Sequence, residues 1–370
     1  MRVFFAGGGT GGHLYPGLAI ARALVKANPK AQPFFIGARR GIEREVLPKT
    51  EFPFVLLDLH PLYRSQIWKS WRTAAGGAKA WLAIARLTGE EKPRVVVGTG
   101  GYASVIALAF GAARGIPLVL QEQNSYPGIA TRVFSRFARQ IHLGFPEARK
   151  YLKSRADAVV LDSGNPIQPP PGIRPARDVA KQAWGFPGNA RILLVFGGSQ
   201  GAVAVNEVVA AWVRAGVPDG VHVIWATGRG SFATYAPLES ERVRVRDYIA
   251  PMESAYAVAD VALARAGAMS TAELAAWGIP MILVPLPTAA ADHQMTNARA
   301  LESAGAATVI AQRDFSAERL DAEVRGIFGS AGRIDQMSAS VLSRARPNAA
   351  DEIAGHILRL IEARQLAASS

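Results

Sequence analysis

Val-Phe-Phe-Ala-Gly-Gly-Gly-Thr-Gly-Gly-His occupies residues 3–13, and Ile-Leu-Leu-Val-Phe-Gly-Gly-Ser-Gln-Gly-Ala occupies residues 192–202. Each stretch is a short apolar run that leads into a glycine-rich loop and then into a helical pattern. An apolar run of this kind is typical of a parallel strand buried on both faces. Strand, glycine loop and helix form the natural opening of a doubly wound α/β domain, so their occurrence twice predicts two such domains.

Further apolar runs continue the alternation of strands and helices in both halves of the chain. Between the halves lies Pro-Ile-Gln-Pro-Pro-Pro-Gly at 166–172, whose prolines can continue neither a helix nor a central strand. We therefore place the domain joint near Gly164 and expect a closing helix over 347–363 that returns to the first domain. The predicted domains are 1–164 plus about 347–370, and 165–346. The further predicted strands are 33–36, 54–57, 95–97, 117–120, 221–225, 261–263 and 281–284.

Composition narrows the class of protein. The chain has 370 residues, no cysteine and 19% charged residues, which favours a soluble α/β protein without disulfides or thiolate metal sites. No apolar stretch reaches the roughly 18 residues that a membrane-spanning helix needs. The short run at residues 2–6 leads directly into a glycine loop, so we expect no signal peptide.

The net charge of +13 is distributed unevenly. Residues 1–164 hold 23 Lys and Arg against 10 Asp and Glu, whereas residues 165–370 hold 19 of each kind. The first half is therefore expected to meet an anionic partner, such as a nucleic acid, an acidic membrane surface or a phosphorylated substrate. A charge that serves only solubility is the alternative.

The first glycine loop points to a phosphate-bearing ligand. Glycines allow backbone N–H groups to approach an anion, and the start of the following helix favours negative charge. Gly7, Gly9 and Gly12 also fit the dinucleotide-binding fingerprint. That fingerprint requires an acidic residue at the end of the second strand, where this chain has Arg39 and Arg40. Because arginines suit a 2′-phosphate, an NADP-dependent oxidoreductase is one alternative, and a non-catalytic basic binding protein is another.

A third loop, Gly-Thr-Gly-Gly-Tyr at 98–102, again follows a predicted strand. Three such loops split between two domains suit a site for two phosphorylated ligands. The P-loop pattern of nucleoside triphosphatases is absent from the sequence, and no His, Asp and Glu cluster has metal-ligand spacing. We therefore expect no metal and no cofactor, with helix ends and arginine stabilising the developing charge.

Taken together, the motifs resemble the MurG family of N-acetylglucosaminyltransferases. The resemblance implies two Rossmann-like doubly wound domains facing a cleft, the GT-B type of glycosyltransferase. It also implies an inverting transfer of GlcNAc from UDP-GlcNAc to the muramyl 4-hydroxyl of lipid I (undecaprenyl-pyrophosphoryl-MurNAc-peptide), which gives lipid II. The matching motifs run in the family's order over nearly the whole chain: Gly-Gly-Gly-Thr-Gly-Gly-His (7–13), Gly-Thr-Gly-Gly-Tyr (98–102), Glu-Gln-Asn (122–124), Gly-Asn-Pro (164–166), Gly-Gly-Ser-Gln-Gly-Ala (197–202), Arg-Ala-Gly (265–267) and Asp-His-Gln (292–294).

The resemblance assigns the donor UDP-GlcNAc mainly to the second domain. It implies that Glu273 accepts hydrogen bonds from both ribose hydroxyls, that the backbone of Ile249 reads uracil and that Arg265 approaches the diphosphate. Gln168 stands where the family usually has arginine, which puts a phosphate contact there in doubt. The other residues assigned to the donor are Thr10, Gly11, Gly12, Asn124, Ser199, Gln200 and Gln294.

The resemblance assigns the acceptor and the general base to the first domain. His13 and Glu122 are the candidates for the base that takes the 4-hydroxyl proton, and a histidine near its ordinary pKa suits that task. His13 at a helix start could equally bind or orient phosphate. The residues assigned to the acceptor are Gly8, Gly9, Thr99, Gly100, Gly101 and Tyr102.

A stripe of tryptophans with neighbouring cations crosses residues 67–82. Such a stripe is usually a core face, but it also suits a helix that dips into lipid headgroups, and lipid I lies in the membrane. We therefore expect a peripheral protein at the cytoplasmic face of the cell membrane, in contact with an anionic surface. No nucleic-acid motif accompanies the stripe, so no nucleic acid is expected. The predicted contacts are Trp68, Lys69, Trp71, Arg72 and Trp81.

Overall fold

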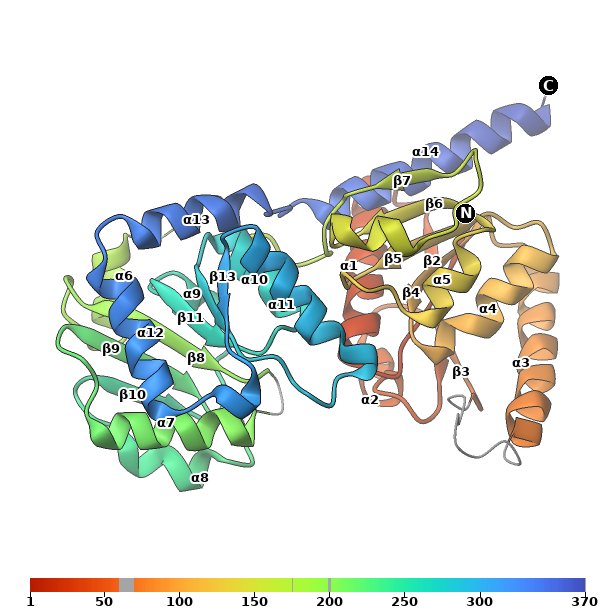
Figure 1. Ribbon diagram of the computed structural model, residues 1–370. Helices are drawn as coiled ribbons and strands as arrows, with labels where there is room; N and C mark the ends of the chain where they lie inside the picture. The colour runs from red at the N-terminus through yellow and green to blue at the C-terminus, as the bar shows by residue number, and fades with distance from the viewer. Residues whose placement is uncertain (60–69, 175, 199–200, 370) are drawn as a thin grey trace. The chain divides into compact units, whose positions relative to one another are not determined.

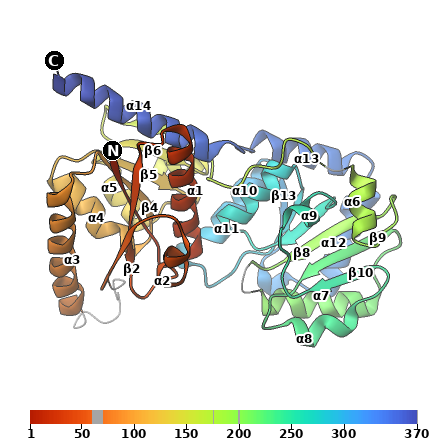
Figure 2. The ribbon, with the colours of Figure 1, turned by 180° about the vertical axis from the view of Figure 1, so that it is seen from behind.

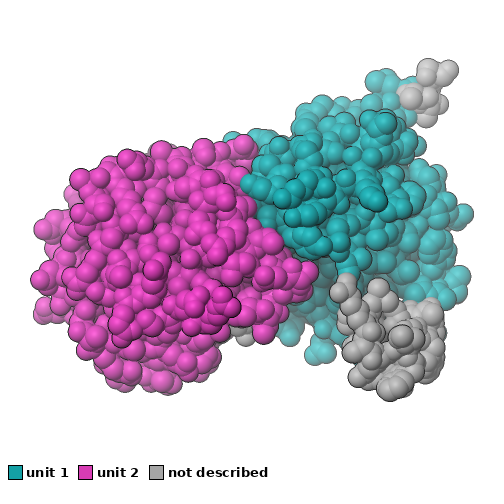
Figure 3. Space-filling model, viewed as in Figure 1, with its two compact units in different colours: residues 1–168, 348–370 teal, residues 169–347 magenta. Residues whose placement is uncertain are grey.

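Strands and helices alternate along the chain and build two parallel sheets, each flanked by helices (Figure 1). The computed structural model describes residues 1–59, 70–174, 176–198 and 201–369. Two compact units result: unit 1 comprises Met1–Gln168 and Asn348–Ser370, and unit 2 comprises Pro169–Pro347 (Figure 3). The joint predicted near Gly164 thus lies inside unit 1, which ends at Gln168 within the proline-rich segment.

Unit 1 contains a seven-stranded sheet in the order β3-β2-β1-β4-β5-β6-β7, and every pairing in it is parallel. The order reverses between β1 and β4, as in doubly wound domains. Its elements are β1 (Arg2–Gly7), α1 (Gly11–Ala27), β2 (Gln32–Ala38), α2 (Glu43–Val46), β3 (Phe54–Leu57), α3 (Ser70–Glu90), β4 (Val95–Gly100), α4 (Tyr102–Ala113), β5 (Leu118–Glu122), α5 (Ile129–Phe134), β6 (Ala138–Leu143), β7 (Val159–Leu161) and α14 (Ala349–Ser369), with short 3₁₀ turns at Leu47–Lys49 and Pro146–Tyr151.

Unit 2 repeats the scheme with six parallel strands in the order β10-β9-β8-β11-β12-β13. Its elements are α6 (Arg177–Ala183), β8 (Arg191–Phe196), α7 (Val203–Ala215), β9 (Val221–Ala226), α8 (Phe232–Tyr235), β10 (Val243–Arg246), α9 (Glu253–Tyr256), β11 (Val261–Ala264), α10 (Ala268–Trp277), β12 (Met281–Leu283), α11 (His293–Ser303), β13 (Ala307–Val309), α12 (Ala317–Gly329) and α13 (Arg333–Ser343), with 3₁₀ turns at Ala236–Leu238, Ala290–Asp292 and Gln312–Asp314.

Helix α14 closes unit 1, although it comes from the far end of the chain. It packs beside α1, as both ribbon views show (Figures 1 and 2). Ile353, Ile357 and Ile361 join Leu14 and Leu24 in one buried cluster. These isoleucines recur at helical spacing, so one apolar stripe of α14 supplies part of the core of the first domain.

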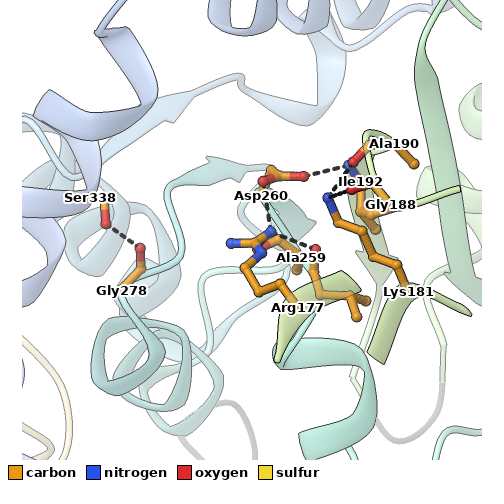
Figure 4. Close-up of polar contacts among 10 residues, drawn as sticks. Arg177, Lys181, Gly188, Ala190, Ile192, Ala259, Asp260, Gly278 and Ser338 are labelled. Atoms are coloured by element: carbon orange, nitrogen blue, oxygen red, sulfur yellow. Dashed lines mark hydrogen bonds and ion pairs between the residues drawn. The ribbon is translucent and has the colours of Figure 1, made fainter. Parts of the chain in front are cut away.

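Polar contacts fix the amino-terminal edge of the sheet in unit 2 (Figure 4). Arg177 of α6 donates to Asp260 Oδ1 at 2.7 Å, and Asp260 Oδ2 accepts the N–H of Ile192 at 2.7 Å. Lys181 donates to the Ala190 carbonyl oxygen at 2.6 Å. These contacts anchor α6 at the starts of β8 and β11, which leaves the carboxyl ends of those strands for the loops that carry the motifs.

Candidate active site

The two glycine loops of unit 1 touch each other at the carboxyl ends of β1 and β4. The N–H of Gly8 donates to the Gly100 carbonyl oxygen at 3.4 Å. A Cβ on Gly101, whose φ is +73°, would lie 2.1 Å from the Gly8 carbonyl oxygen. A side chain at Gly101 would therefore force the loops apart, and the glycine is required by their close approach as well as by its positive φ.

His13 lies between these loops in the first turn of α1. Its Nδ1 is 3.0 Å from Thr10 Oγ1, and its backbone carbonyl accepts the hydroxyl of Thr99 at 2.7 Å. A Cβ on Gly100 would meet His13 Cδ2 at 2.8 Å, so the second loop lies against the imidazole ring. Thr99 is buried and its hydroxyl orients the helix that carries His13.

The second candidate base, Glu122, ends β5 and is 3% exposed. Its Oε1 accepts the N–H of Asn124 at 3.1 Å, and its Oε2 accepts the N–H of Gly128 at 3.1 Å. Burial raises the pKa of this carboxyl group, while hydrogen bonds from Thr131, Asn124 and Gly128 act in the opposite direction. Both oxygens thus hold the 122–128 loop in shape.

A network of amide side chains connects two of the predicted motifs. Gln121 Nε2 donates to Asn165 Oδ1 at 3.1 Å, and Asn165 Nδ2 donates to the Gln123 carbonyl oxygen at 3.0 Å. Gln123 Nε2 donates in turn to the Thr99 carbonyl oxygen at 2.9 Å. These buried amide groups supply hydrogen-bond partners for one another. The Glu-Gln-Asn and Gly-Asn-Pro motifs therefore stabilise the carboxyl end of the sheet beside the glycine loops.

Glu43 is a residue that the sequence interpretation missed. It is fully buried beneath the first glycine loop, and its carboxylate accepts the N–H groups of Gly9 and Ala38. The available signal was an acidic residue shortly after the second strand, beyond Arg39 and Arg40. Arg39 donates a hydrogen bond to the Leu56 carbonyl oxygen, and Arg40 forms an ion pair with Asp58.

In unit 2, the motifs gather at the carboxyl ends of β8, β11 and β12, which are neighbours in the sheet. After β8, a Cβ on Gly201, whose φ is +75°, would lie 2.3 Å from the Thr227 carbonyl oxygen. Ser199 and Gln200, predicted as donor ligands, lie outside the described residues.

Arg265 follows β11 and is 9% exposed. Its Nη1 donates to the carbonyl oxygens of Val284 at 3.0 Å and Pro285 at 3.3 Å, while Nη2 donates to Gln312 Oε1 at 2.7 Å. Burial lowers its pKa. The guanidinium group therefore ties the segment after β12 to the turn after β13, a role that the sequence did not indicate.

Glu273 lies in α10, which begins at Ala268. Its Oε2 accepts the hydroxyl proton of Tyr256 at 2.8 Å. Burial raises the pKa of Glu273, and the hydrogen bond from Tyr256 acts against that rise. Tyr256 is fixed by ring contacts with Phe196 and Trp277, at centroid distances of 6.4 and 5.9 Å. This tyrosine was also missed, because nothing in its local sequence relates it to Glu273.

Two further donor candidates follow strands β12 and β10 of unit 2. Gln294, near the start of α11, accepts the Leu286 N–H on its Oε1 at 2.9 Å. This contact orients its amide group and holds the segment after β12. Ile249 follows β10, and its side chain is buried, so that only its backbone is suited to reading a base.

The predicted membrane-contacting residues fall largely outside the described structure. Trp68 and Lys69 precede the described part of α3, and the side chains of Trp71 and Arg72 are not described. Trp81 is partly buried, and its ring packs edge-on against Phe110 at 5.0 Å. Trp81 thus contributes to the core of unit 1, in agreement with the alternative interpretation of the stripe as a core face.

Two features are absent from the described ranges. None of their helices combines the length and apolar character needed to cross a membrane. Within the same ranges, His, Asp and Glu do not gather in groups of three or more that could hold a metal ion.

Comparison with known protein families accounts for both units. The glycosyltransferase family 28 N-terminal domain matches residues 3–143, and the family 28 C-terminal domain matches residues 192–353. The chain belongs to glycosyltransferase family 28. The two parallel sheets and the matches of both family 28 domains confirm the predicted fold class of two doubly wound domains.

Among the relatives of this chain, the UDP-N-acetylglucosamine–N-acetylmuramyl-(pentapeptide) pyrophosphoryl-undecaprenol N-acetylglucosamine transferase of Salinibacter ruber is 39% identical, over 97% of each chain. The protein of the same name from Moorella thermoacetica is 37% identical, over 98% of this chain and all of its own. The crystal structure of Acinetobacter baumannii MurG aligns with a TM-score of 0.77 at 25% identity, covering 97% of this chain and 99% of that one. The predicted resemblance to MurG is thereby confirmed.

Proposed function

We propose that this protein transfers N-acetylglucosamine from UDP-GlcNAc to the muramyl 4-hydroxyl of lipid I and so produces lipid II for peptidoglycan synthesis. The observation that carries the proposal is the 39% identity, over 97% of the chain, to a transferase named for this donor and acceptor. The loops at the carboxyl ends of the central strands supply the chemistry that such a transfer needs.

Unit 2 is the proposed donor domain. Glu273 can accept hydrogen bonds from the ribose hydroxyls, because a carboxylate offers two acceptor oxygens and Tyr256 occupies one side of one of them. The backbone at Ile249 would read uracil, and Gln294 would meet the sugar hydroxyls through its amide nitrogen. Arg265 acts mainly by shaping the segment after β12, because its guanidinium group is engaged with three protein oxygens.

Unit 1 is the proposed acceptor domain, with His13 as the general base. Glu122 is the weaker candidate, because both of its oxygens accept backbone N–H groups. The His13 tautomer that donates Nδ1–H to Thr10 keeps its lone pair on Nε2. That nitrogen takes the proton of the 4-hydroxyl group. At the same time the 4-hydroxyl oxygen bonds to C1 of GlcNAc, and UDP leaves with the electron pair of the broken C1–O bond.

The acceptor carries an undecaprenyl chain, so the proposed place of action is the cytoplasmic face of the cell membrane. The excess of positive charge in residues 1–164 would attract an anionic surface to the acceptor domain. Contact through residues 67–72, which precede or begin α3, is part of this proposal.

A ligand screen tests the function against its alternatives. Thermal unfolding of the purified protein is measured with UDP, UDP-GlcNAc, NADPH and a short oligonucleotide, and a ligand at about 100 times its dissociation constant adds about 2.7 kcal/mol. We expect stabilisation by UDP and UDP-GlcNAc only, and formation of a disaccharide product from a lipid I analogue. Stabilisation by NADPH without any effect of UDP would refute the proposal.

A further inference from the structure

The buried carboxylate of Glu43 lies under the first glycine loop of unit 1. Glu43 belongs to the short helix α2 and is 0% exposed. Both of its oxygens lie 3.0 Å from the backbone nitrogen of Gly9, and Oε1 also accepts the N–H of Ala38 at 3.1 Å. All three contacts come from backbone N–H groups, so amide dipoles balance this charge. A buried carboxylate is costly unless it is hydrogen-bonded, which makes its placement here informative.

Glycines make the room that this side chain occupies. A Cβ on Gly8 would lie 1.9 Å from Glu43 Oε1, and a Cβ on Gly41 would lie 1.9 Å from Oε2. Gly9 adopts a φ of +88°, a conformation that turns its N–H toward the carboxylate. The loop thus packs closely against Glu43. Gly8 and Gly9 serve this packing instead of a ligand.

The orientation of Gly9 has a consequence for ligand binding. Its N–H points to Glu43, so it does not serve as an anion donor while this contact exists. The next residue, Thr10, contacts His13 Nδ1 through its hydroxyl at 3.0 Å and accepts the backbone N–H of His13. The position of Gly9 therefore determines where Thr10, and through it the imidazole, can lie.

We propose that Glu43 is a positioning residue that holds Gly9 and thereby sets the Thr10–His13 pair for the acceptor, and that Gly9 N–H is not an acceptor ligand. The proposal rests on the proposed function, because it assigns His13 to the transfer. It predicts that loss of the carboxylate lowers turnover while donor binding in unit 2 stays intact.

The test compares Glu43→Gln with Glu45→Gln, a change of the same kind at an exposed position of the same helix. We expect Glu43→Gln to lower kcat with a lipid I analogue at least tenfold and to keep UDP affinity within twofold. Glu45→Gln should leave both unchanged. A Thr10→Val substitution should lower kcat as well, and adding Glu43→Gln to it should cost little more, because both act through His13.

A second measurement does not depend on activity. Amide hydrogen exchange of a peptide that contains Gly9 should quicken in Glu43→Gln but not in Glu45→Gln, even if the parent protein transfers no sugar. Absence of transfer by the parent would refute the proposed function alone. A folded Glu43→Gln protein with parental kcat and parental exchange would refute the positioning role. If Glu43→Gln does not fold, Glu43→Asp decides: full kcat refutes the role, and a reduced kcat at parental UDP affinity supports it.

Discussion

Tyr256→Phe is the most informative single substitution, because it removes one hydroxyl and keeps the ring. The hydroxyl donates to Glu273 at 2.8 Å, while the ring packs against Phe196 and Trp277. Burial raises the pKa of Glu273, and the hydrogen bond from Tyr256 lowers it. Without the hydroxyl, the pKa of Glu273 rises further, and the carboxylate that should bind the ribose is protonated over a wider pH range.

The magnitude follows from the energy of such contacts. A hydrogen bond to a charged group contributes about 1.5–3 kcal/mol, which corresponds to roughly 10- to 150-fold in a dissociation constant. Glu273→Gln should weaken UDP binding by this order wherever the carboxylate of the parent protein is ionised. In Tyr256→Phe the loss of UDP affinity should be largest between the pKa of Glu273 in the parent and its higher pKa in the variant. The loss should diminish as rising pH ionises Glu273 in the variant as well. The sign follows because UDP is proposed to bind the ionised form, so that protonation competes with the ligand.

Calorimetric titration of UDP between pH 5 and pH 8 measures this dependence. Tyr235→Phe is the matched control, because Tyr235 is a buried tyrosine of the same unit that packs on Trp225. It should bind UDP as the parent does. Parental affinity of Tyr256→Phe and Glu273→Gln across the whole pH range would show that Glu273 does not contact UDP.

Three further outcomes are expected. Arg265→Lys should lower the stability of unit 2 by about 1–3 kcal/mol without any ligand, because it leaves buried carbonyl oxygens unpaired. An unchanged melting temperature together with weakened UDP binding would instead favour direct contact of Arg265 with the diphosphate. His142 is buried and neutral, with a pKa of about 3 caused by burial. In the unfolded chain this histidine takes up a proton below about pH 6.5, so unit 1 should lose about 1.4 kcal/mol of stability for each pH unit of acidification. This loss should be absent in His142→Gln. Thermal unfolding at pH 5 and pH 7 measures the difference. A Trp68→Ala/Trp71→Ala protein should sediment less with vesicles of anionic lipid while retaining UDP affinity, and equal sedimentation would remove this segment from the membrane contact.

The sequence by itself predicted the architecture where strands are continuous apolar runs. The central strands β1, β4, β8 and β11 read as continuous apolar runs, and the first three lead into glycine loops, a local pattern that needs no knowledge of partners. Four strands escaped the sequence analysis: β6, β7, β10 and β13. β10 reads Val-Arg-Val-Arg, and β7 and β13 span three residues each, so they are strands because a neighbour in the sheet offers its edge.

The same division holds for the candidate site. The motifs located the segments that carry His13 and Glu273, because glycine content and helix starts are local features. Only the tertiary structure placed Glu43 under Gly9 and Tyr256 against Glu273, across 34 and 17 residues of sequence. The tertiary structure also showed that the carboxylate oxygens of Glu122 accept hydrogen bonds from backbone N–H groups. Hydrogen-bond partners of this kind are decided by how strands lie side by side, and sequence spacing does not encode that arrangement.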